Sequence, residues 1–93
     1  MATSKIQRQY VTKDFSGSTT ISGNNVAAVQ GDFALSGYTP IGIIRVQKSG
    51  TNASYVSITR FHLSATQWII GLYNNRSDEI TCTVSITVLY EKA

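Results

Sequence analysis

The chain has 93 residues, enough for one domain, and its eight Lys and Arg against five Asp and Glu leave a net charge of +3. Charged residues make up only 14% of the sequence, whereas a typical globular domain has about 25%. Hydrophobic residues make up 42%, which excludes a disordered chain. The single cysteine excludes a disulfide framework. No apolar run approaches the roughly 20 residues of a membrane helix.

The first half of the chain reads as short strands between turns. Residues 1–15 are predicted to form an N-terminal arm or an edge strand. Clusters rich in Gly, Ser and Asn then predict turns, and they lie at Ser16–Ser18, Gly23–Asn25, Gly31–Asp32, Ser36–Gly37 and Ser49–Asn52. Short strands are expected between them, around residues 19–22, 26–30 and 33–35.

Two central segments, residues 41–46 and 56–63, change the parity of their apolar positions midway. These positions are Ile41, Ile43, Ile44 and Val46 in the first segment, and Val56, Ile58, Phe61 and Leu63 in the second. A shift of one residue turns every later side chain to the other face of a sheet. Either a β-bulge lies in each segment, or both faces are covered, the second by a partner subunit.

The last part of the chain carries the clearest pattern. Every even position from Ile80 to Tyr90 is apolar, which indicates a strand with one buried face. Residues 68–73 are apolar on both faces, and we expect Trp68 in the core. Residues 74–78 are typical of a turn, so a β-hairpin is predicted. In all, the pattern predicts one domain over residues 1–93, a small antiparallel β-sandwich of jelly-roll type with seven to eight strands.

Catalytic groups are scarce. His62 is the only histidine and falls within a strand, and Cys82 lies on the apolar face of the last strand. One His and one Cys are too few for a zinc site. No phosphate-binding or nucleophile motif occurs. We therefore expect no enzymatic activity, no metal and no cofactor.

Two kinds of ligand fit the polar residues. Sugar sites combine an aromatic platform with amide and carboxylate groups, and the candidate residues are Tyr55, Tyr73, Asn74, Asn75, Arg76 and Asp78. The alternative is a small basic β-domain that binds single-stranded nucleic acid, in which Arg45 and Arg60 could share a face. The cations are spread along the whole chain, which disfavours nucleic acid.

Three stretches resemble the C-terminal tip domain of phage tail-fibre and baseplate proteins. They are Gly37-Tyr38-Thr39-Pro40-Ile41-Gly42-Ile43, Trp68-Ile69-Ile70-Gly71-Leu72-Tyr73-Asn74-Asn75-Arg76-Ser77, and Thr83-Val84-Ser85-Ile86-Thr87-Val88-Leu89-Tyr90-Glu91-Lys92. That family carries a "gly-tyr-x-pro-ile" strand and a "tyr-asn-x-ser" turn before a last strand that closes on "val-leu-tyr-x-lys". The resemblance covers roughly residues 37–92.

The resemblance implies a jelly-roll-like sandwich, a homotrimer and a place at a tail tip or virion surface. It also implies adhesion through receptor binding, often to cell-surface glycans. The family has an upstream shaft or attachment domain that this chain lacks, so we expect an excised tip or a small stand-alone virion protein. With no signal peptide and no membrane segment in the sequence, we expect synthesis in a bacterial cytoplasm without membrane insertion.

Overall fold

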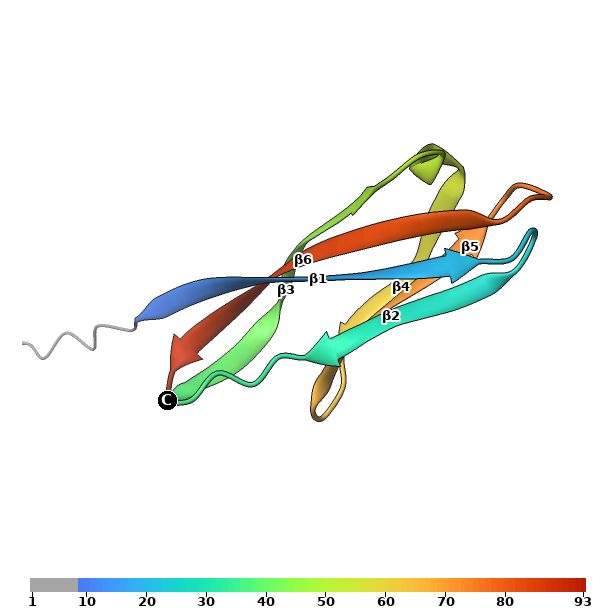
Figure 1. Ribbon diagram of the computed structural model, residues 1–93. Coiled ribbons are helices and arrows are strands. Elements are labelled where there is room, and N and C mark those ends of the chain that lie inside the picture. The colour runs from blue at the N-terminus through green and yellow to red at the C-terminus, as the bar shows by residue number, and fades with distance from the viewer. Residues whose placement is uncertain (1–8) are drawn as a thin grey trace, which may run out of the picture.

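A computed structural model of the chain describes residues 9–93, which form six β-strands and one short 3-10 helix (Figure 1). The elements in chain order are β1 (Tyr10–Ile21), β2 (Val26–Asp32), β3 (Tyr38–Ser49), η1 (Ala53–Tyr55), β4 (Val56–Leu63), β5 (Gln67–Asn74) and β6 (Ile80–Lys92). The all-β class predicted from the sequence is confirmed.

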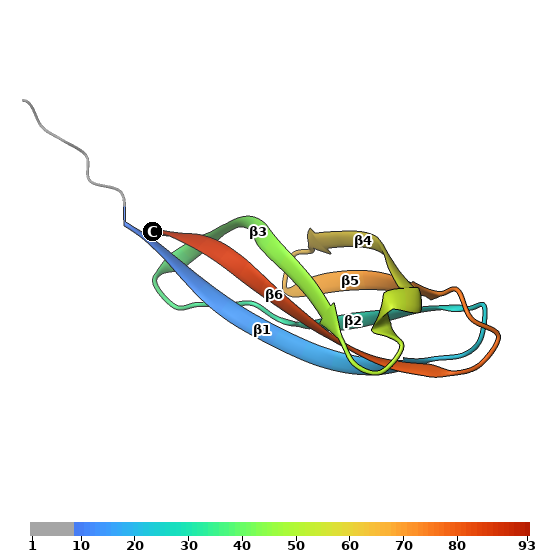
Figure 2. The same ribbon diagram turned by 90° about the horizontal axis from the view of Figure 1, so that it is seen from above.

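The strands form two three-stranded antiparallel sheets, β1-β6-β3 and β2-β5-β4, which face each other across the core (Figure 2). Among the described residues, the chain changes sheet at every connection except the one between β4 and β5. Of the predicted N-terminal arm or edge strand, the part from Tyr10 onward is an edge strand of the first sheet. Residues 1–8 lie outside the described part.

The predicted hairpin between residues 68–73 and 80–90 is wrong. β5 and β6 are the central strands of different sheets, so the loop between them is a crossover. The two strands instead turn their apolar faces toward each other. Every even residue of β6 from Ile80 to Tyr90 is at most 3% exposed, which confirms the alternating pattern, and Trp68 is 2% exposed, which confirms its place in the core.

The strand number is six in residues 9–93, rather than seven to eight, because two glycine clusters are not turns. β1 continues through Gly17, where an added Cβ would lie 2.6 Å from Val29 Cγ1 and 3.5 Å from Trp68 Cη2. Gly31 lies within β2, and its added Cβ would lie 2.9 Å from the indole Nε1 of Trp68. Both glycines make room for side chains of the core. Residues 33–35, predicted as a strand, form an irregular connection.

The parity changes in the two central segments coincide with shifts in strand register, as the bulge alternative predicts. The register with the neighbouring strand shifts between Pro40 and Gly42 and between Ile43 and Arg45 in β3, and between Ile58 and Arg60 in β4. The bulges do not bury all the apolar side chains. Ile41, Ile44 and Phe61 remain 51%, 58% and 55% exposed.

The close approach of Gly31 to Trp68 predicts a large difference between two glycine substitutions. Gly31→Ala forces its methyl group against the rigid indole ring, and we expect a loss of about 1–3 kcal/mol in the free energy of unfolding. Gly42→Ala is the matched control, because no atom lies within 4 Å of its added Cβ, and it should change stability by less than about 1 kcal/mol. Urea unfolding of both variants measures this. Equal losses would contradict the packing described for Trp68.

Candidate functional site

Three polar loops meet at one end of the two sheets, and we call this the polar end (Figures 1 and 2). They are residues 22–25 between β1 and β2, residues 50–55 between β3 and β4, and residues 75–79 between β5 and β6. Asn24 and Asn52 have φ angles of 53° and 65°, a left-handed backbone that asparagine tolerates well. Gly23 touches the third loop so closely that an added Cβ would lie 2.0 Å from the Ser77 carbonyl oxygen.

The loop of residues 75–79 is hydrogen-bonded to both of the others. The backbone N–H of Asn24 donates to the carbonyl oxygen of Arg76 at 2.7 Å. The Asn75 backbone N–H and side-chain Nδ2 both donate to the Tyr55 carbonyl at 3.0 Å, and Nδ2 also donates to Ser57 Oγ at 2.8 Å. Backbone groups of all three loops are therefore paired within the polar end, and this pairing fixes the position of the loops.

Asn74, at the end of β5, anchors the polar end from inside. Its side chain is fully buried, and Nδ2 donates to the carbonyls of Ile21, Ser22 and Asp78 at 3.0, 3.4 and 2.7 Å. Its Oδ1 accepts the Arg76 backbone N–H at 2.8 Å. The buried amide thus satisfies polar groups of two loops, among them the buried carbonyl of Ile21. Asn74 positions the site from beneath and has no surface to offer a ligand.

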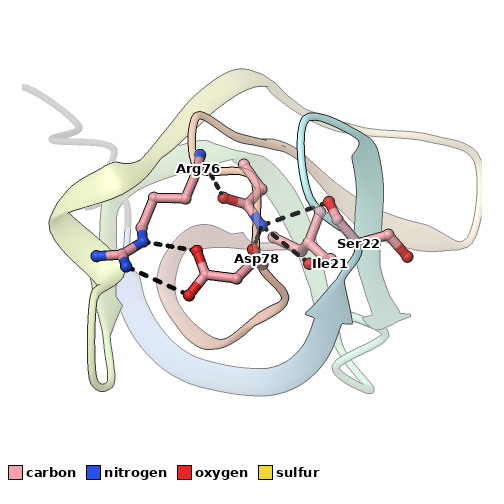
Figure 3. A network of polar contacts seen from close by, with 5 residues as sticks. Ile21, Ser22, Arg76 and Asp78 are labelled. Carbon is pink, nitrogen blue, oxygen red and sulfur yellow. Dashed lines mark hydrogen bonds and ion pairs between the residues drawn. The ribbon is translucent and has the colours of Figure 1, made fainter.

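Arg76, Asp78 and Tyr55 form a connected cluster on the surface of the polar end. The Arg76 guanidinium donates to both carboxylate oxygens of Asp78, at 2.8 and 3.3 Å (Figure 3). Its central carbon lies 4.8 Å from the centroid of the Tyr55 ring, which is 47% exposed. A cation at this distance is attracted to the face of the ring. The cluster therefore presents an aromatic ring, a guanidinium and a carboxylate in contact with one another.

The ionisation of the cluster follows from the same contacts. The pKa of the Asp78 carboxyl lies below its usual value, chiefly because the carboxylate accepts the hydrogen bond from Arg76. The pKa of the Arg76 guanidinium is raised, first by that hydrogen bond and then by the charge of Asp78. Both groups are charged at neutral pH, so the cluster offers donors and acceptors side by side with no net charge.

The structure brings four of the six predicted site residues together at the surface: Tyr55, Asn75, Arg76 and Asp78. Asn74 is buried beneath them. Tyr73 pairs with Val26 and Ser57, and the alternation of β5 turns it to the outer face of its sheet, away from the cluster. The sequence pattern could have predicted both positions. The even-numbered residues of β5, Trp68, Ile70 and Leu72, point into the core, so Asn74 points inward and Tyr73 points outward.

Two further titratable residues within residues 9–93 were singled out in the sequence, His62 and Cys82. His62 lies exposed on the outer face of β4. Cys82 is fully buried, and burial raises the pKa of its thiol, which keeps it protonated and unreactive. Residues 9–93 contain no group of three or more His, Cys, Asp or Glu that could hold a metal. Nor does any helix in this part of the chain have the length and apolar character of a membrane span.

Two hollows lie away from the polar end and were not predicted. One, of about 790 Å³, is bordered by residues 33–41 and 63–65, and the other, of about 400 Å³, by residues 43–46 with Ile58 and Phe61. Both lie along β3 and β4. The parity change of these strands could have predicted the hollows, because a bulge in an edge strand leaves apolar side chains partly uncovered.

Comparison of the chain with protein-family models, with curated proteins and with solved structures gives no match. The functional interpretation therefore depends on the geometry of the polar end and of the two sheets.

The anchoring role of Asn74 predicts a contrast between two neighbouring asparagines. Asn74→Ala leaves the buried Ile21 carbonyl, the part-buried Asp78 carbonyl and the Arg76 N–H without their partner, so the free energy of unfolding should fall by about 2 kcal/mol. Asn75→Ala removes bonds of an exposed side chain and should cost less than about 1 kcal/mol. Urea unfolding of the two variants gives both values. A smaller loss for Asn74→Ala than for Asn75→Ala would show that the buried amide does not anchor the loops.

The Arg76–Asp78 pair predicts a pH dependence. The folded-state pKa of Asp78 is lowered, so the pair stabilises the fold above the unfolded carboxyl pKa of about 3.9, and this contribution disappears as the pH falls through the folded-state value. Asp78→Asn should therefore be less stable than the wild type at neutral pH, and the difference should vanish in acid. Thermal unfolding of both proteins across this range is the measurement. A constant difference at all pH values would exclude the pair as its cause.

Proposed function

We propose that this protein is a non-catalytic adhesive module of a phage tail or virion surface, which binds a cell-surface glycan or receptor through its polar end. The observation that carries the proposal is the surface cluster of Tyr55, Arg76 and Asp78. Sugars offer hydroxyl groups around an apolar ring face, and a neutral cluster with an exposed aromatic ring suits both. Because hydrogen bonds already hold the loops in place, binding costs little ordering entropy.

The proposal extends to the fold, for which we infer a six-stranded jelly-roll-like sandwich. In support, the two central strands are the last two of the chain, β5 and β6, and each lies between earlier strands of its own sheet. Every connection except the one between β4 and β5 also crosses between the sheets. Jelly rolls occur in viral capsid proteins and lectins. A shared fold does not establish a shared function, so the proposed activity depends on the polar end.

We further propose that the module is a homo-oligomer, with a trimer favoured by the resemblance to tail-fibre tips. Physical support comes from Ile41, Ile44 and Phe61, which are more than half exposed. Ile44 and Phe61 border the same hollow, and contiguous exposed apolar surface of this kind marks interaction sites when the patch is large. All three lie on β3 and β4, away from the loops of the polar end, so association there would leave the polar end free.

Single-stranded nucleic acid is the competing ligand. The two central cations do not share a face as that alternative expects. The register pairs Arg45 with Thr87 on the outer face of one sheet, and Arg60 with Gly71 on the outer face of the other. The binding experiment therefore includes single-stranded DNA as a competing ligand.

Binding to bacterial cells or to a glycan array tests the function. Tyr55→Ala and Arg76→Ala should each weaken binding about tenfold or more, because each removes part of the ring–guanidinium contact. Tyr10→Ala is the matched control. Tyr10 is similarly exposed, at 52%, but stands at the start of β1, at the other end from the loops, so its variant should bind like the wild type.

The result that would overturn the proposal is binding that survives both site substitutions or falls equally with the control. Retention of the wild type on single-stranded DNA at about 0.15 M salt, with no binding to cells or glycans, would favour the nucleic-acid alternative.

A further inference from the structure

The charges at the polar end cancel, although the chain as a whole is cationic. The three loops carry one cation, Arg76, and two acids, Asp78 and Glu79. A second cation reaches them from the end of β3, where Lys48 Nζ donates to the Ala53 carbonyl at 3.0 Å. Two cations against two acids leave no net charge at this end, so the net charge of +3 comes from the rest of the chain.

Both cations of the polar end are engaged by groups of the protein itself. The Arg76 guanidinium donates to both carboxylate oxygens of Asp78 and lies against the Tyr55 ring (Figure 3). The Lys48 ammonium is bonded to a loop carbonyl in a part-buried position. A carboxylate, sulfate or phosphate on a ligand is normally bound by a cation that faces it directly. At the polar end such a group would compete with Asp78 for Arg76, and it would meet the negative charge of Asp78 as it approached.

The acid of the pair is more exposed to solvent than the cation. The side chain of Asp78 is 60% exposed and that of Arg76 is 35% exposed. An ionised carboxylate has about four acceptor positions on its two oxygens, and the two bonds from Arg76 leave acceptor capacity on an exposed group. Hydroxyl groups suit this capacity as donors, because O–H bonds to a carboxylate are short and strong.

Exposed neighbours of Asp78 extend the same surface with uncharged groups. The Tyr55 ring is 47% exposed and offers an apolar surface to the ring face of a sugar. Asn75 and Ser77 are exposed in the same loop as Asp78, and they add an amide and a hydroxyl. The surface is therefore suited to a ligand that is rich in hydroxyl groups and carries no charge.

We propose that the ligand of the polar end is a neutral glycan, and that Asp78 selects it over acidic glycans. Hydroxyl groups of the neutral sugar donate to the exposed carboxylate of Asp78 while the sugar ring lies against Tyr55. An acidic glycan is excluded because Asp78 repels it and also holds the guanidinium that would otherwise receive it. The inference rests on the proposed function and names the class of glycan that the site binds.

Paired glycans test the class of ligand. Each pair consists of a short neutral oligosaccharide of galactose or mannose and the uronic acid oligosaccharide of the same linkage, in which a carboxylate replaces the CH2OH group of each sugar. Binding is measured with the full chain at about 0.15 M salt. The wild type should bind at least one neutral member about tenfold or more tightly than its acidic counterpart, because only the acidic member meets a like charge.

Asp78→Asn tests the selecting role of this residue. The amide keeps the shape of the carboxylate but not its charge, so Arg76 becomes able to pair with a carboxylate on the ligand. The preference for the neutral member should fall about tenfold or more. Adding Arg76→Gln to Asp78→Asn should remove the acidic binding that was gained.

Asp32→Asn is the matched control, because it makes the same change of charge at an exposed residue at the end of β2 that lies away from the loops. It should keep the wild-type preference. Circular dichroism verifies that each variant is folded. The preference of the wild type needs no substitution, so it tests the class of ligand even where a variant does not fold.

The outcomes separate this inference from the proposed function. Equal or tighter binding of the acidic members by the wild type would overturn the inference, and so would a preference that Asp78→Asn leaves unchanged. Binding to bacterial cells that depends on Tyr55 and Arg76, with no binding to any neutral glycan, would also overturn it and leave the proposed adhesion standing. Binding that does not depend on Tyr55 and Arg76 would overturn the proposed function, and the inference with it.

Discussion

The buried amide of Asn74 is the interaction on which the polar end depends. It lies where the chain leaves one sheet for the other, and it bonds the end of β1, the turn after it and the crossover loop at the same time. The Asn74 side chain is fully buried and both of its polar atoms are bonded, so loosening the loops would leave this amide unpaired away from water. The surface cluster of Tyr55, Arg76 and Asp78 takes its position from this anchor.

The two sheets supply the platform for that arrangement. β5 and β6 face each other as central strands, and their alternating apolar residues make most of the core. Gly17 and Gly31 allow the Trp68 ring to fit beneath β1 and β2, which closes one side of the molecule. The bulges of β3 and β4 leave the other side open. The same fold thus has a polar end, one closed side and one open side.

Local patterns predicted the strands better than their partners. The period-two alternation of β6 and the parity changes of β3 and β4 could be read directly, because side-chain direction depends only on neighbours in sequence. The hairpin prediction failed because a five-residue loop such as 75–79 can join strands of one sheet or of two. Gly17 was misread as a turn because its role depends on Trp68, which is distant in sequence. The candidate site could be predicted only in part. The buried Asn74 and the exposed Asn75 are told apart in the sequence by strand parity alone. The contact between Tyr55 and Arg76 depends on the crossover, which brings together two loops that are distant in sequence.

The central claim is that the loops of the polar end are held rigid before any ligand binds. Amide hydrogen exchange, followed by NMR in the wild-type chain, tests it most directly. The backbone N–H groups of Asn24, Asn75 and Arg76 each donate to a partner within the polar end, so they should exchange at least about a hundredfold more slowly than in an unstructured peptide. Exchange of these three amides at the rate of a free loop would contradict the account.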